Sequence, residues 1–109
     1  MTQADAKLIS GFIARTGMYV CPVDEHGIVS FIVGYEVGSQ GRCQFTKLLA
    51  EELAKKHRVK PDGQGWPGQV RRFGERRGIR WTEAFILSAS SILTKTLGTN
   101  VRSSKKMAN

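Results

Sequence analysis

The chain has few cysteines and prolines and no long hydrophobic run. Two cysteines and three prolines occur among its 109 residues, which excludes the framework of several disulfides found in small secreted domains. The longest uncharged stretch in an apolar context, residues 84–94, holds three serines. It is too short for a membrane-spanning helix, which needs about 20 apolar residues. The polar first residues lack a hydrophobic signal region, and we therefore expect a cytoplasmic protein with no membrane span.

A metal-binding or catalytic motif is also lacking. Cys21, His26, Cys43 and His57 are separated by 4, 16 and 13 residues, whereas structural zinc sites use close pairs such as C-x2-C. Neither Cys–His combination has flanking sequence that indicates an activated nucleophile. Residues 63–68 match G-x-G-x-x-G, but no hydrophobic strand precedes them, as a dinucleotide site requires. We therefore expect no metal, no cofactor and no enzymatic activity.

The charge is abundant and unevenly distributed. The chain has a net charge of +8. Residues 1–55 contain five Lys/Arg and six Asp/Glu, a net charge of −1, whereas residues 56–109 contain twelve and three, a net charge of +9. This asymmetry indicates a surface that meets an acidic partner such as nucleic acid, an acidic protein or anionic lipid. The alternative is a solubilising charge with a basic tail.

Hydrophobic spacing predicts helices over most of the chain. Apolar residues recur at helical intervals in residues 4–15, 45–56, 67–76 and 83–97. Residues of the types that begin and end helices stand at the margins of these segments. They are Thr2 or Asp5, Asp24, Pro67 and Thr82 at helix starts, and Gly17, Gly78 and Gly98 at helix ends.

Two segments are ambiguous. Residues 28–37 are rich in β-branched side chains, which favours a strand, but Asp24 and Gly38 are placed as the ends of a buried helix, and we predict a helix. Residues 18–20 are predicted to be extended, which leaves room for a short strand pair near Met18 and an α+β alternative. The predicted fold is mainly α, a compact single-domain bundle of four or five short helices over residues 1–98. Residues 99–109 are predicted to be a mobile basic tail.

Arginines are concentrated on one predicted helix and just after it. Arg72 and Arg76 are four residues apart and share a flank, and the planar guanidinium suits phosphate. Trp66, Phe73 and Trp81 are interleaved aromatics, as in nucleic-acid-binding surfaces, although a solvated helix face over core aromatics explains the same pattern. A helix-turn-helix is disfavoured by the long link before residue 67. The candidate binding residues are Arg71, Arg72, Arg76, Arg77 and Arg80, with Lys55, Lys56, Arg58 and Lys60.

One segment resembles a known group of sequences. Residues 15–19, R-T-G-M-Y, resemble the R-x-G-M-Y segment of small uncharacterised bacterial proteins, some from mobile, integron-type gene cassettes. In those proteins an apolar segment ending in G-Y-E follows, which corresponds to residues 34–36, and a later tryptophan corresponds to Trp66. The resemblance covers about the first 40 residues and implies a bacterial accessory or immunity-like protein with no known chemistry.

These features predict a non-enzymatic binding protein with an acidic partner. Nucleic acid is the favoured partner and an acidic protein the alternative, with the arginine-rich helix as the binding element. The second interpretation is an accessory protein-binding factor of immunity or antitoxin type that uses an apolar patch. A homodimer is compatible with so small a core, although no residue pattern demands one.

Overall fold

The computed structural model describes residues 1–98, and these fold into helices with no strand. The mainly α class predicted from hydrophobic spacing is confirmed, while the predicted tail, residues 99–109, lies outside the described residues. Within the described part, no helix is long and apolar enough to span a membrane. The elements are α1 (Gln3–Ala14), the 3-10 turn η1 (Thr16–Met18), α2 (Glu25–Gly38), α3 (Phe45–Lys55), α4 (Gly65–Arg77) and α5 (Trp81–Leu97).

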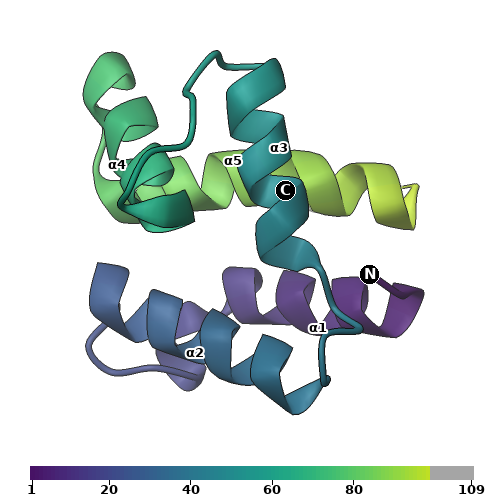
Figure 1. Ribbon diagram of the computed structural model, residues 1–109. Helices are drawn as coiled ribbons and strands as arrows, with labels where there is room; N and C mark the ends of the chain where they lie inside the picture. Colours follow the sequence, from purple (N-terminus) through teal and green to yellow (C-terminus); the bar gives the residue numbers. More distant parts are fainter. Residues whose placement is uncertain (99–109) are drawn as a thin grey trace.

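The longest helix, α5, is the element around which α1, α3 and α4 pack. It contacts α1, α3 and α4, and Figure 1 shows α1 and α2 side by side in the lower part of the view, with α3, α4 and α5 above them. The first and last helices also share a hydrogen bond, since Gln3 Nε2 donates to the carbonyl of Thr96 at 2.6 Å. The buried apolar side chains form one core to which all five helices contribute, including Ile9, Ile32, Leu49, Val70 and Leu93.

The segment with mixed helix and strand signals is helical. Asp24 is the N-cap of α2, and its Oδ1 accepts a hydrogen bond from the amide of Gly27 at 2.9 Å. Glu25 in the first turn suits the helix dipole. Ile28 and Ile32 are the buried residues of this helix. The cap and one buried stripe therefore prevail over the β propensity of residues 28–37.

The predicted strand pair near Met18 is wrong. The chain continues from α1 into η1, where the amide of Met18 donates to the carbonyl of Arg15 at 2.9 Å. The hydroxyl of Thr16 donates to the carbonyl of Phe12 at 3.0 Å, which keeps the chain coiled past the end of α1. Tyr19 then packs edge-on against the rings of Phe12 and Phe31, so the apolar segment is held by aromatic contacts rather than by a partner strand.

Helix boundaries differ from the predicted ones by one or two residues at several ends. Pro67 is the third residue of α4 rather than its first, because the helix begins at Gly65. Arg80, not Thr82, is the N-cap of α5, and the side chain of Glu83 accepts a hydrogen bond from the Arg80 amide at 3.4 Å. Gly78 and Gly98 end their helices in the left-handed conformation, as predicted.

A buried carboxylate joins α1 to α2 and to the segment before α3. Asp5 is fully buried and completes a capping box with Thr2. Its Oδ1 accepts a hydrogen bond from the hydroxyl of Tyr35 at 2.5 Å, and its Oδ2 pairs with the guanidinium of Arg42. The Arg42 hydrogen bond, with those of Tyr35 and Thr2, outweighs the opposing effect of burial and holds the pKa of Asp5 well below its ordinary value.

Candidate functional site

The segment between α3 and α4, which carries several of the candidate cations, is firmly held. Val59 at its centre is fully buried. The amide of Val59 donates to the carbonyl of Leu53 at 2.9 Å, and its own carbonyl accepts a hydrogen bond from Nε2 of the buried Gln69 at 2.8 Å. Arg58 and Lys60 flank Val59 and are exposed. This segment therefore presents two cations on a fixed backbone.

Two arginines of α4 reach back to the same segment. Arg76 Nη1 donates to the carbonyls of His57 at 3.3 Å and Arg58 at 3.2 Å. Because carbonyls carry no net charge, Arg76 keeps its full positive charge at the surface. Arg72 differs, because it donates to the carbonyl of Lys60 but also pairs with the carboxylate of Asp62, which neutralises it.

Seven exposed cations come from four successive parts of the chain: the end of α3, the segment after it, the end of α4 and the last turn of α5. Lys55, Lys56 and Lys95 line one hollow of about 530 Å³. Lys56, Arg77 and Lys95 line a neighbouring hollow of about 430 Å³, and Arg76 contacts the backbone of the segment that follows Lys56. We call this set the basic surface; it consists of Lys55, Lys56, Arg58, Lys60, Arg76, Arg77 and Lys95.

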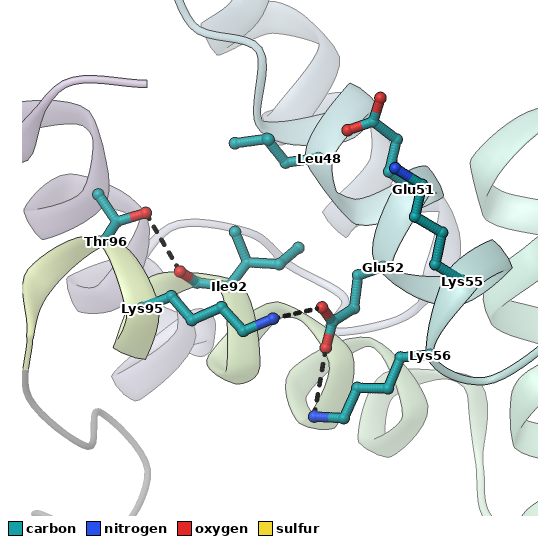
Figure 2. A pocket seen from close by; sticks show the side chains of 8 residues that line it. All are labelled: Leu48, Glu51, Glu52, Lys55, Lys56, Ile92, Lys95 and Thr96. Atoms are coloured by element: carbon teal, nitrogen blue, oxygen red, sulfur yellow. Dashed lines mark hydrogen bonds and ion pairs between the residues drawn. The ribbon is translucent and has the colours of Figure 1, made fainter.

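One buried carboxylate serves both lysines that the two hollows share. Figure 2 shows Glu52 between Lys95 and Lys56, and its oxygens lie 3.0 Å and 3.5 Å from the two ammonium groups. Glu52 also accepts a hydrogen bond from the hydroxyl of Ser91 at 2.6 Å. Burial acts to raise the pKa of Glu52, but the hydrogen bonds from Ser91 and Lys95 and the charges of both lysines hold that pKa below its ordinary value.

Three of the nine predicted residues are not part of the basic surface: Arg72, which Asp62 neutralises, and Arg71 and Arg80, which lie apart from it. Arg71 Nη2 is 2.5 Å from Oε2 of Glu25 at the start of α2, and its Nη1 donates to the side chain of Gln64 at 3.0 Å. Arg80 pairs with Glu83 at 3.3 Å in the first turn of α5. Each of these arginines therefore has a carboxylate partner outside the basic surface, although the sequence placed them beside the others.

The aromatic residues that suggested stacking with bases are packed into the protein. Phe73 is 3% exposed. Trp81 stacks on Phe85 with ring centroids 5.5 Å apart and donates its Nε1 to the carbonyl of Pro67 at 3.0 Å. Trp66 packs against the same core and is half-buried. The alternative of core aromatics under a solvated helix face fits these positions, so these rings are not available to stack with bases.

Lys95 is a member of the basic surface that sequence reasoning missed. It lies 35 residues or more after the other lysines of the set, in the last turn of α5. A lysine there is expected from the helix dipole alone, so nothing in the sequence marked it as a binding residue. Its position follows from the packing of α3 against α5.

The cysteines and histidines do not gather into a metal site. Among residues 1–98, no group of three or more His, Cys, Asp or Glu side chains could hold a metal ion. Cys21 is exposed and Cys43 buried, and burial raises the pKa of the Cys43 thiol. His57 is half-buried against Phe73, and burial lowers the pKa of its imidazole. Burial thus favours the neutral imidazole, and His57 lies at the edge of the basic surface.

Comparison with known proteins identifies no relative of this chain. No protein-family model, no curated protein and no solved structure matches this chain. The features of this chain that bear on its function are therefore the geometry and charge of the basic surface and the apolar side chains that α1, η1 and α2 expose.

Proposed function

We propose that this chain is a non-enzymatic nucleic-acid-binding protein that receives the phosphate backbone on its basic surface. The observation that supports this function best is that most of the seven cations have no ion-pair partner. Among the described residues, Lys55, Arg58, Lys60, Arg76 and Arg77 form no ion pair, and Lys56 and Lys95 share the single carboxylate of Glu52. Cations that have no carboxylate partner attract a polyanion, and the counterions of the polyanion are released when it binds.

The way these cations are held also favours a charged ligand. Arg76 is oriented by two backbone carbonyls, and Arg77 lies over the ring of Phe73 with its Cζ 5.1 Å from the ring centroid. Both contacts fix a guanidinium without cancelling its charge. A pre-oriented arginine loses less side-chain entropy when it contacts a phosphate.

The test is fluorescence anisotropy with labelled single-stranded and duplex oligonucleotides at about 50 and 200 mM salt, the range over which phosphate-driven affinity changes most. The informative variant is Arg58→Gln with Arg77→Gln, which removes two cations of the basic surface that have no carboxylate partner. Replacing Arg72 and Arg76 is less informative, because both bond to the segment between α3 and α4. We expect duplex binding to weaken and its salt slope to fall by about 1.8, about 0.9 for each lost phosphate contact.

The matched control is Arg71→Gln with Arg80→Gln, which removes two arginines already paired with Glu25 and Glu83. It changes the net charge by the same amount but leaves the basic surface intact, so affinity should stay within about twofold of the wild type. Equal losses for both double variants would assign the binding to net charge alone. Absence of binding at about 50 mM salt would overturn the proposed function.

A second function, protein binding by an accessory factor of immunity or antitoxin type, is favoured by a separate observation. The large apolar side chains that are exposed in the described residues all belong to residues 8–37, and Met18 and Val37 are more than two-thirds exposed. The resemblance of residues 15–19 to small bacterial proteins agrees with this alternative. The test is binding of a purified partner protein to the purified chain. Binding to the wild type and to the Arg58/Arg77 variant, but not to the variant Val33→Ser with Val37→Ser, would support this second function.

A further inference from the structure

The second hollow of the basic surface has a composition that suits one particular anionic group. It lies among the end of α3, the last turn of α4 and the second half of α5, and has a volume of about 430 Å³. Lys56, Arg77 and Lys95 line it together with His57 and Ser90. We call it the Ser90 hollow.

The two neighbouring hollows differ in their charges. Glu51 and Glu52 line the first hollow together with Lys55, Lys56 and Lys95, so its acidic side chains largely balance its lysines. The Ser90 hollow has three cations and no carboxylate among its lining residues. Lys56 and Lys95 share Glu52, which is not among the lining residues of this hollow. When its charge is included, the three cations and Glu52 together still have two positive charges in excess. An anion is therefore favoured in the Ser90 hollow and not in its neighbour.

Ser90 provides an observation that is independent of charge. It is 6% exposed, and its buried Oγ has no hydrogen-bond partner within the described structure. A buried hydroxyl without a partner is uncommon and costs free energy. The adjacent Ser91 contrasts with it, because the Ser91 hydroxyl is already bonded to Glu52. Because Ser90 lines the hollow, a small rotation of its hydroxyl toward a bound oxyanion would give the hydroxyl the acceptor that it lacks.

We propose that the Ser90 hollow binds a phosphomonoester, the terminal phosphate of a nucleic acid or of a free nucleotide. This inference rests on the proposed function and adds an end-specific contact to it. A phosphomonoester carries about −1.5 to −2 charge at pH 7 and has three acceptor oxygens, which matches the two excess positive charges and the free hydroxyl. An internal phosphodiester carries only one negative charge, so it contacts the basic surface without matching both excess charges of the hollow.

The experiment compares two 3′-labelled single-stranded oligonucleotides of identical sequence, one with a 5′-phosphate and one with a 5′-hydroxyl. The full chain is used as the wild type, Arg77→Gln and Ser90→Ala. The second variant removes only the unpartnered hydroxyl and should fold normally. Arg80→Gln is the matched control, since Arg80 does not line the hollow and is paired with Glu83. A parallel NMR titration with AMP, against adenosine as its control, tests the free nucleotide as the source of the phosphate.

The proposal predicts that the 5′-phosphate strengthens wild-type binding about tenfold, and that this advantage is lost in Arg77→Gln, reduced in Ser90→Ala and kept in Arg80→Gln. Equal affinity for both oligonucleotides, with AMP no better than adenosine, would overturn the proposal while leaving the proposed function intact. An advantage that survives both Arg77→Gln and Ser90→Ala would also overturn it. Phosphate-dependent binding of AMP without oligonucleotide binding would support the hollow as a nucleotide site and overturn the proposed function.

Discussion

The two ends of the helical bundle differ in how many of their charged side chains have an ion-pair partner, although each end has one buried carboxylate. In the α1–α2 region, Asp5 is fully buried, and its Arg42 and Tyr35 partners join separate elements. The large apolar side chains that the described residues expose all lie in this region, with Val33 and Val37 on α2. In the α3–α5 region the exposed side chains are mostly cations, and Arg76 is held by backbone carbonyls rather than by a carboxylate.

This difference shows that the same residue types can be neutralised within the fold or remain charged at the surface, according to their partners. An ion pair around a buried carboxylate stabilises the fold but leaves little charge for a ligand. A cation oriented by uncharged groups adds little to stability and remains attractive to an anion. The comparison predicts that charge removal destabilises the protein in the α1–α2 region and weakens binding in the α3–α5 region.

The largest expected effect on stability is at Asp5. Asp5→Ala leaves the hydroxyl of Tyr35 and the amide of Thr2 without their buried acceptor and should lower the free energy of unfolding by about 2–3 kcal/mol. The half-exposed Arg42 regains water, so the loss falls at the lower end of the range for buried pairs. Urea denaturation measures the change. Asp24→Ala, which removes an exposed cap, should cost about 1 kcal/mol, and an equal loss for both variants would contradict the comparison.

The same carboxylate predicts a dependence of stability on pH. Because folding lowers the pKa of Asp5, its contribution is fully present above the ordinary aspartate pKa of about 3.9 and is lost as the pH falls toward the lowered value. The stability difference between the wild type and Asp5→Asn should be constant from about pH 7 to 5 and shrink below about pH 4. Urea denaturation at each pH measures it. A difference that grows in acid would show that Asp5 does not have a lowered pKa in the folded protein.

A smaller effect is expected at Gln69, which holds the segment that carries Arg58 and Lys60. Gln69→Ala leaves the buried carbonyl of Val59 without its donor and should lower the free energy of unfolding by about 2 kcal/mol. Hydrogen exchange should show reduced protection at the Val59 amide. Gln64→Ala replaces an exposed residue of the same type five positions earlier and should change stability by less than about 0.5 kcal/mol. Unchanged exchange at Val59 would show that the segment does not depend on Gln69.

The smallest effect on stability is expected on the exposed face of α2. Val33→Ser with Val37→Ser replaces side chains that are 44% and 71% exposed, so the free energy of unfolding should change by less than about 0.5 kcal/mol. Sedimentation measures the oligomeric state of the same variant. If this face joins two copies of the chain, the wild type sediments as a dimer and the variant as a monomer. A stability loss above about 1 kcal/mol would show that the face is part of the core.

Most of the helical fold could be predicted from local signals. Asp24 marked the start of α2 in spite of the β-branched residues that follow. Gly78 and Gly98 marked helix ends because glycine readily adopts the left-handed conformation that both residues have. Such signals act within one turn, so a sequence alone contains them. The strand expected near Met18 had no partner to pair with, and the hydrogen bonds of Thr16 to the end of α1 decided that segment.

The candidate site could be predicted only in part. The sequence identified most of the cations, but it gave no sign that Arg76 bonds to carbonyls 18 and 19 residues earlier or that Arg71 pairs with Glu25 in another helix. Lys95 joins the basic surface because α5 packs against α3. Whether a cation is neutralised depends on these distant contacts, and no local pattern records them.

The packing of α1 on α5 has a consequence for folding kinetics. These helices stand at opposite ends of the described chain and share the Gln3–Thr96 hydrogen bond, so their docking closes a loop of nearly the whole domain. The three later helices pack through shorter loops, and we expect them to form the folding nucleus before α1 docks. Ile9→Val in α1 should therefore speed unfolding about fivefold and leave the folding rate almost unchanged in stopped-flow measurements. The contacts of the N-terminal helix would then determine the unfolding rate, and with it the lifetime of the native state.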